Sequence, residues 1–313
     1  MKRDTYHQEN KRDMNKNSRM RIVHSNARIE AERAENERLQ AELRRTRNEV
    51  EAAYQALAEI NKDITDSINY SRRIQDAILP ERDILTNFMS DAFFMYNPKD
   101  IVSGDFYWFT KYDNKIIVAV ADCTGHGVPG AFMSMIGHNL LNEIVNVKDI
   151  TQPAEILSRL DRGLRKLLKQ DNENTSAKDG MDIAICSIDP ENNLLEFAGA
   201  NRQAVIFSKG VLNELRGERA PVGGAYREGE SRYTNYSMRI EKGDKIYLFT
   251  DGLTDQFGGP NNKKLMTKRF RQLLNIVNPL KMAQQKRVIS RFFEDWKGSN
   301  KQTDDVLLIG MTI

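Results

Sequence analysis

The feature that most constrains the fold is a long stretch without helix breakers. Residues 22–79 contain neither proline nor glycine and are rich in Glu, Arg, Ala and Gln, which favour helix. Apolar side chains recur there every seventh residue until Pro80 ends the pattern. A heptad stripe of this kind is buried only against another helix, so the sequence predicts a coiled coil over residues 21–62. The heptad positions are Ile22, Ile29, Asn36, Leu43, Val50, Leu57, Ile64, Ser71 and Ile78.

The coiled coil is expected to make the chain a homodimer. An asparagine in such a series, here Asn36, commonly fixes the register of parallel dimers. The companion heptad series is patchy, because only part of it is apolar, which predicts a marginal coil. A lone solvated helix with chance periodicity is the alternative. The apolar members of that companion series are Leu39, Ala53, Ile60 and Ile74.

The chain divides by composition into four segments. Residues 1–20 are polar and aperiodic, which predicts disorder. Residues 63–85 continue the helical pattern as a linker or switch helix. Residues 86–313 alternate short β-rich runs with turns, which predicts an α+β domain with largely antiparallel strands. Helices are expected at 130–147 and 153–170, with two more in 263–296 separated near Pro279.

Overall composition argues against several kinds of partner. The formal net charge of +3 over 313 residues gives no reason to expect nucleic acid. No apolar run is long enough to span a membrane. The two cysteines, Cys123 and Cys186, are far apart and lack the spacing of a metal site, so we expect a reduced, cytoplasmic protein.

Carboxylates stand at the ends of several apolar, strand-like runs. One such acid is ordinary turn chemistry, but four segments that each present one suggest convergence. Gathered carboxylates repel each other unless a cation neutralises them, and an all-oxygen set suits Mg²⁺ or Mn²⁺. Two such ions are suited to hydrolysing phosphate esters, while capping and turn roles stay open from spacing alone. The acids are Asp105 in SGDFYWF, Asp122 in KIIVAVADC, Asp251 in IYLFTDGLTD, and Asp304 and Asp305 in NKQTDDVLLIGM.

Six blocks in order resemble the SpoIIE-type (RsbU-like) serine/threonine phosphatases of the metal-dependent PPM superfamily. The resemblance covers residues 97–313. It implies a β-sandwich of two antiparallel sheets flanked by helices, preceded here by the long N-terminal helix or coiled coil. The blocks are DIVSGDFYW, ADCTGHGVPGAFMSMIG, MDIAICSID, LEFAGANRQAVI, LFTDGLTDQFGG and TDDVLLIG.

The resemblance also implies a site for two Mn²⁺ or Mg²⁺ ions at one edge of the sandwich. By motif position, Asp122 would bridge both ions, and the main-chain carbonyl of Cys123 would bind one of them. The other expected metal-site residues are Asp105, Asp251, Asp304 and, acting less directly, Asp305. The expected catalytic residues are Asp105, Asp122, Asp251 and Asp304.

Two residues depart from the pattern of eukaryotic relatives. Asn201 in the GANR turn stands where those enzymes carry an Asp that helps to hold a third metal, which makes a third metal doubtful here. His126 lies two residues beyond the place of their histidine, so we expect a hydrogen-bonded turn residue and not a general acid.

The function implied by the resemblance is phosphoserine/phosphothreonine protein phosphatase activity in bacterial signalling. Phosphate would be hydrolysed by a water that two metal ions activate, and the substrate would be a phosphoprotein such as a STAS-domain anti-sigma antagonist. The alternative is a coiled-coil signalling scaffold whose phosphatase domain is weak or inactive. We further hypothesise that the helix before Pro80 repositions Asp105 and the Asp122 loop.

Overall fold

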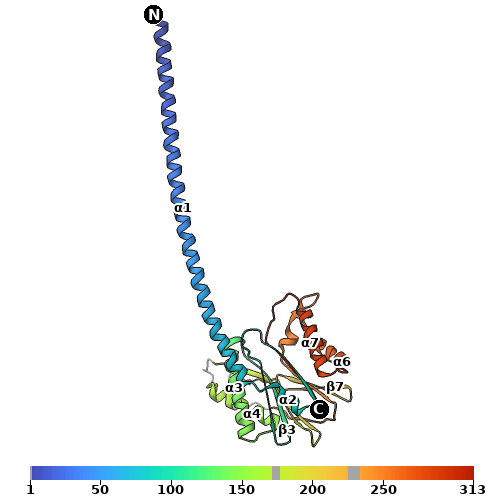
Figure 1. Cartoon of the computed structure of the whole chain (residues 1–313). Coiled ribbons are helices and arrows are strands. Elements are labelled where there is room, and N and C mark those ends of the chain that lie inside the picture. Colours follow the sequence, from blue (N-terminus) through green and yellow to red (C-terminus); the bar gives the residue numbers. More distant parts are fainter. Residues whose placement is uncertain (1, 171–176, 225–232) are drawn as a thin grey trace. The chain divides into compact units, whose positions relative to one another are not determined.

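The computed structural model describes residues 2–170, 177–224 and 233–313. The chain divides into two compact units, residues 1–66 and 67–313. One helix, α1 (Lys2–Ile78), runs through the first unit and contributes its last turns to the second (Figure 1).

Helix α1 is 77 residues long and ends two residues before Pro80, which confirms the predicted stop. The helix begins at Lys2, whereas the sequence pattern predicts disorder over residues 1–20. Met1 lies outside the described residues. That segment is polar, but it contains no proline or glycine, so helix propensity prevails over its low hydrophobicity. The apolar heptad side chains are exposed from Ile22 to Ile64, and their burial in a coiled coil stays a prediction.

The second unit is built on two antiparallel sheets, as the sequence predicts. One sheet has the order β1 (Asp91–Asn97), β13 (Val306–Thr312), β10 (Lys245–Phe249), β6 (Gln203–Ser208), β7 (Val211–Arg216). The other has the order β2 (Phe106–Tyr112), β3 (Lys115–Cys123), β4 (Gly180–Asp189), β5 (Leu194–Ala200), β9 (Tyr236–Arg239), with β8 (Val222–Gly223) paired to β4. A separate small ribbon joins β11 (Phe257–Gly258) to β12 (Lys263–Lys264).

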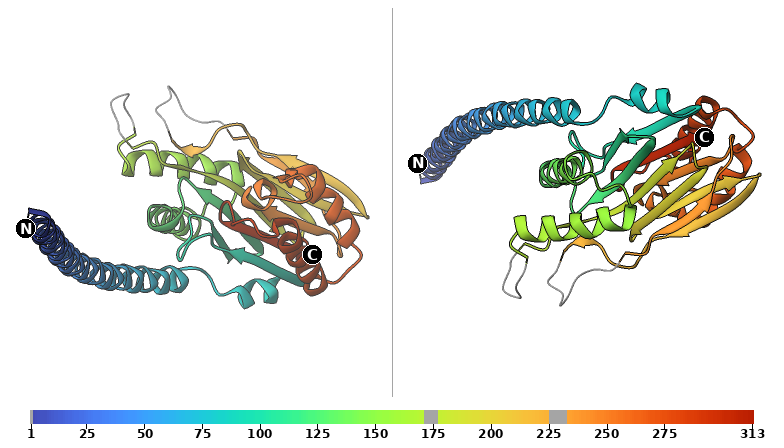
Figure 2. Two further views of the ribbon diagram at one scale, coloured as in Figure 1. Left: turned by 90° about the horizontal axis from the view of Figure 1, so that it is seen from above. Right: turned by 90° about the horizontal axis from the view of Figure 1, so that it is seen from below.

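Helices lie on both outer faces of the sandwich (Figure 2). The expected helix over 130–147 begins three residues earlier and ends in a π-helical turn, and the expected break near Pro279 is confirmed. No helix in the described ranges combines the length and the apolarity needed to cross a membrane. The helices are α2 (Arg82–Phe88), α3 (Gly127–Asn142), η1 (Glu143–Val147), α4 (Pro153–Leu167), α5 (Gly252–Asp255), α6 (Met266–Val277) and α7 (Met282–Lys297).

Successive side chains of the central strands point to opposite faces of their sheets, and they pack into three hydrophobic cores. In β3, Ile117 and Ala119 face α3 and α4, whereas Val118 and Val120 face the opposite sheet. A third core lies between the β10–β13 sheet and helices α6 and α7. The central strands are therefore buried on both faces, and this explains why they read as continuous apolar runs. Each fully buried Leu or Ile contributes roughly 1.5–3 kcal/mol to the free energy of folding. The packed cores therefore hold the strands, and with them the strand ends, in fixed positions.

The last turns of α1 are fastened to this frame by one buried glutamine. The Gln75 Nε2 group donates to the carbonyl of Ser103 at 2.7 Å and to Oγ of Ser134 at 2.9 Å. Its Oε1 accepts from the backbone N–H of Ser103 at 3.1 Å. Gln75 therefore joins the end of α1 to both α3 and the loop that precedes Asp105.

We expect His138 on α3 to make stability depend on pH. Burial lowers the pKa of His138 below its ordinary value of 6.5. As pH falls through 6.5, the unfolded chain takes up the proton before the folded chain does, so folded stability is lost. Between about pH 7.5 and about pH 5.5, the free energy of unfolding in urea should fall more for the wild type than for His138→Gln. Parallel pH profiles of the two proteins would contradict this role.

Candidate active site

Two glycine-rich loops meet without side chains between them beside the strand ends. A β-carbon on Gly104 would lie 2.5 Å from the carbonyl oxygen of Gly125, and one on Gly130 would lie 2.4 Å from the same oxygen. Only glycine allows this approach, which brings the loop before Asp105 against the loop after Asp122. The glycines around the acidic motifs therefore serve backbone packing, which holds the two acid-bearing loops together.

A second close approach brings Asp251 next to the Asp304–Asp305 pair. A β-carbon on Gly252 would lie 1.8 Å from the carbonyl oxygen of Asp305. Strands β10 and β13 are antiparallel neighbours, so the end of one lies beside the start of the other. Thr250 reinforces this junction, because its Oγ accepts from the backbone of Leu307 at 3.0 Å and donates to Asp105 Oδ2 at 2.7 Å.

The two adjacent acids at the start of β13 have different surroundings. Asp305 is buried, and its two oxygens accept the backbone N–H groups of Lys99 at 2.7 Å and Gly104 at 2.8 Å. Asp304 lines the open site, and within the described residues its side chain accepts a hydrogen bond only from the backbone N–H of Asp305, to Oδ1 at 2.8 Å. Asp305 therefore holds the loop before Asp105, while Asp304 faces the cavity.

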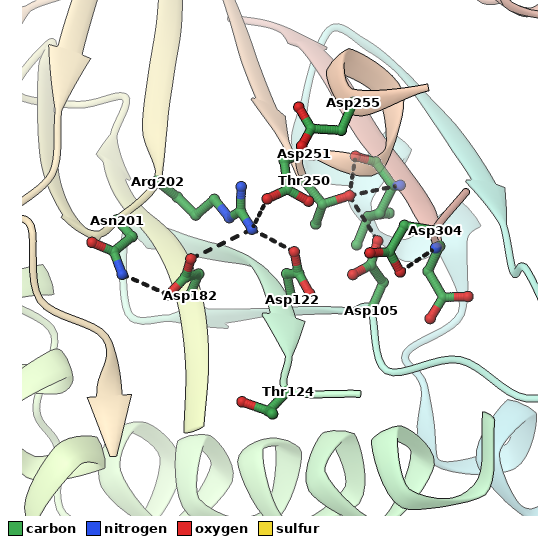
Figure 3. Close-up of polar contacts among 12 residues, drawn as sticks. Asp105, Asp122, Thr124, Asp182, Asn201, Arg202, Thr250, Asp251, Asp255 and Asp304 are labelled. Atoms are coloured by element: carbon green, nitrogen blue, oxygen red, sulfur yellow. Dashed lines mark hydrogen bonds and ion pairs between the residues drawn. The ribbon is translucent and has the colours of Figure 1, made fainter. Parts of the chain in front are cut away.

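One arginine, which was not among the predicted site residues, lies among the acids. The Nη2 group of Arg202 pairs with Asp122, with Asp251 at 2.9 Å and with Asp182 at 3.5 Å (Figure 3). Asp182 is the direct cross-strand partner of Asp122, and its Oδ1 also accepts from Asn201 Nδ2 at 2.8 Å. The guanidinium thus joins carboxylates from β3, β4 and the end of β10.

These side chains line a cavity of about 440 Å³. Its wall includes the acids Asp122, Asp182, Asp251 and Asp304 and the cation Arg202. Asp105 lies behind it, almost fully buried, and Cys123 contributes to the lining at the end of β3. The predicted convergence of acids from distant segments is therefore present, with Asp105 and Asp305 set back from the opening.

Burial penalises the charged form of the carboxylates in this cluster. Desolvation raises the pKa of Asp122 to about 8; Arg202 opposes that rise, and Asp251 and Asp304 add to it. Burial, and after it the charge of Asp122, raises the pKa of Asp105 well above its ordinary value. Burial is also the main cause that raises the pKa values of Asp182 and Asp304. The carboxylates therefore favour the arrival of further cations.

The side chains are not arranged as a ready-made metal cage. Among the described residues, no group of three or more His, Cys, Asp or Glu side chains is placed to hold a metal ion. Arg202 lies between three of the acids, so they contact its guanidinium and not a common point. The metal-ligand roles of Asp105, Asp122, Cys123, Asp251, Asp304 and Asp305 stay predictions.

Two other residues discussed from the sequence have clear positions. His126 Nδ1 contacts Asp100 Oδ2 at 2.5 Å, and within the described residues it forms no hydrogen bond with the clustered acids, as expected of a turn histidine. Asn201 binds Asp182 and takes a positive φ of 55° in the turn between β5 and β6. A signal for Arg202 and Asp182 was present in the sequence, since GANR and MDIAICSID are both motif blocks, but only the strand register brings the two together.

This combination defines a class of protein. An antiparallel β-sandwich covered by helices, with acids from several strand ends at one edge, is the fold of PP2C-type phosphatases, and solved structures match it. The SiaA-PP2C domain of Pseudomonas aeruginosa superposes with a TM-score of 0.73 and 30% identity over 81% of this chain and 98% of that one. The PP2C domain of SpoIIE from Bacillus subtilis, with a fragment of its regulatory domain, matches in fold with a TM-score of 0.54 and 15% identity, over 71% of this chain and 62% of that one.

The chain belongs to the SpoIIE family. The family model described as Stage II sporulation protein E (SpoIIE) matches residues 112–313. A curated relative, the phosphoserine phosphatase RsbU of Bacillus subtilis (strain 168), is 24% identical over 210 residues, which are 64% of this chain. The match spans 57% of the length of that relative.

The contrast between Asp304 and Asp305 can be tested on the free energy of unfolding without metal. Asp305→Asn places an amide N–H₂ against backbone N–H groups, so we expect a loss of about 1–3 kcal/mol. Asp304→Asn should cause no loss, because an amide oxygen still accepts from Asp305 and burial already disfavours the Asp304 carboxylate. Urea unfolding in a chelator measures both, and equal losses would contradict the separate roles.

Proposed function

We propose that this chain is a divalent-cation-dependent phosphoserine/phosphothreonine protein phosphatase of bacterial signalling. The observation that carries the proposal is the gathering of Asp122, Asp251 and Asp304 around one cavity, with Asp105 behind them. The family membership and the phosphatase relatives support it.

The donor chemistry of the site fits Mn²⁺ or Mg²⁺. The clustered side chains offer carboxylate oxygens, which hard cations prefer, and burial makes their negative charge costly without added cations. We propose that Asp122, Asp251, Asp304 and the carbonyl of Cys123 hold two such ions, with Asp105 in support. When bound, the ions would supply activation of water and neutralisation of phosphate charge.

The protein's own residues have separate tasks in this proposal. Asp105 and Thr250 lock the junction of three strands, so the acids keep fixed positions. Asp305 holds the loop before Asp105 through two backbone N–H groups. Cys123 lines the cavity but is not arranged as a protein nucleophile, because it is buried and burial raises the pKa of its thiol.

One observation favours the alternative of a weak or inactive domain. Arg202 already contacts Asp122, Asp182 and Asp251, and so competes with any cation for the same oxygens. In that case the chain would act mainly as a helical signalling scaffold. Activity measured with added cations decides between the two functions.

Hydrolysis of p-nitrophenyl phosphate should require Mn²⁺ or Mg²⁺ and should stop in a chelator. Asp251→Asn should lower kcat/KM by at least roughly 100-fold, because a lost metal ligand removes several kcal/mol of charge stabilisation. The matched control is Asp255→Asn, one helical turn further on, where the carboxylate pairs with Lys264 at 2.6 Å. Cation-independent turnover, or equal losses in both variants, would contradict the proposal.

The substrate is proposed to be a phosphoprotein such as a STAS-domain anti-sigma antagonist. The support is the likeness to RsbU, a phosphoserine phosphatase of Bacillus subtilis. Turnover of a phosphoserine protein should exceed turnover of nucleotides and sugar phosphates at equal concentration. A preference for the small molecules would indicate a metabolic phosphoesterase instead.

We also propose that α1 pairs with a second copy of the chain and acts as the switch helix. The exposed heptad stripe supports pairing, and Gln75 links the end of the helix to the Asp105 loop. Rotation of the helix would act on Ser103 first, and through it on the loop that Asp305 holds. Cation-dependent activity would then depend on the state of the helix.

Pairing predicts that charges on the stripe separate the dimer. Val50→Glu/Leu57→Glu should give a monomer in analytical ultracentrifugation, because two charges per chain would be buried. Ala52→Glu/Gln55→Glu adds the same charge on another face of α1 and should stay dimeric. A monomeric wild type, or an unchanged dimer in the stripe variant, would contradict the coiled coil.

A further inference from the structure

The guanidinium of Arg202 has donors that the protein does not use. All three of its carboxylate contacts are made by one nitrogen, Nη2. Its Nε is buried without a hydrogen-bond partner. Arginine carries five N–H donors in a planar fork, and leaving a buried donor unpaired costs free energy. Arg202 lines the cavity, and its described contacts leave the N–H groups of Nη1 unused, so the guanidinium has capacity for another oxygen-rich group.

The backbone around Arg202 is fixed on both sides. The N–H of Asn201 donates to the carbonyl of Glu218 at 2.7 Å, and the carbonyl of Arg202 accepts from the N–H of Gly217 at 3.0 Å. Asn201 also donates through its side chain to Asp182. The arginine consequently starts from a rigid turn, which aims its side chain at the cavity.

The three acids that contact Arg202 differ in what else they are proposed to bind. Asp122 and Asp251 are proposed cation ligands, whereas the side chain of Asp182 contacts Asn201 and Arg202. Cations on Asp122 and Asp251 would withdraw those oxygens from the guanidinium. Asp182 would then remain as its anchor, and the freed donors would face the cavity.

We propose that Arg202 is the side chain that binds the phosphoryl group of the substrate, with Asp182 and Asn201 as its positioning residues. The planar fork of arginine matches two phosphate oxygens at once, which a point charge does not. Lys178 also lines the cavity, but it is exposed. This inference deepens the proposed function, and it rests on that function for the statement that the phosphoryl group belongs to a phosphoprotein substrate.

The test measures binding of inorganic phosphate to the full chain in saturating Mg²⁺, by calorimetry or ³¹P NMR. Arg202→Gln should weaken phosphate binding at least about tenfold, while Mg²⁺ affinity is retained or increased. The phosphate affinity of Arg202→Lys should lie between those of the wild type and Arg202→Gln, because lysine keeps the charge but lacks the planar fork of donors. Asp182→Asn should also weaken phosphate binding. The matched control is Arg216→Gln, an exposed arginine on β7 that pairs with Glu214 at 3.3 Å and should change nothing.

Three results would overturn the inference. These are phosphate affinity within about twofold of wild type in Arg202→Gln, loss of Mg²⁺ and phosphate binding together in that variant, and no phosphate binding by the wild type. The second result would make Arg202 a support of the metal site only. Binding is measured without turnover, so the two proposals can fail separately. A chain that binds phosphate through Arg202 but hydrolyses no ester would contradict the proposed function and would still support this inference.

Discussion

The burial of several carboxylates around one guanidinium is the interaction on which the rest of this structure depends. Asp122 lies on β3, Asp182 lies on β4 and Asp251 follows β10, and Arg202 is the cation that joins them. Burial is the main cause that raises the pKa values of Asp122 and Asp182, and Arg202 offsets that rise only in part. The site is thus built to accept more positive charge, and its arginine has donors to offer once that charge arrives.

The frame holds this unfavourable arrangement through backbone contacts and buried strands. Gly252 lets Asp251 approach the start of β13, and Gly104 lets the loop before Asp105 reach the loop after Asp122. Apolar cores on both faces of the central strands stabilise those positions. The acids therefore stay together because the strands that carry them cannot separate, and not because the acids attract each other.

The sequence was informative where the signal was local or repeated. Strand ends marked by acids, the stop of α1 before Pro80 and the break near Pro279 follow from residue types at known spacings. The contact of Arg202 with three carboxylates could not be predicted, because it depends on the pairing of Asp122 with Asp182 across β3 and β4. Polarity alone also misled over residues 1–20, where the absence of helix breakers was the better guide. The sequence also could not show which of Asp304 and Asp305 faces the cavity, because that depends on the backbone N–H groups of the distant loop that bind Asp305.

The most direct measurement of the central claim is anomalous diffraction at the manganese edge from crystals of this chain grown with Mn²⁺. The account predicts two manganese peaks roughly 3.5–4 Å apart beside Asp122, with Asp251 and Asp304 among the ligands and the Arg202 guanidinium turned away from Asp122. Manganese bound elsewhere, or Arg202 still paired with Asp122 and Asp251 in a site without manganese, would contradict it.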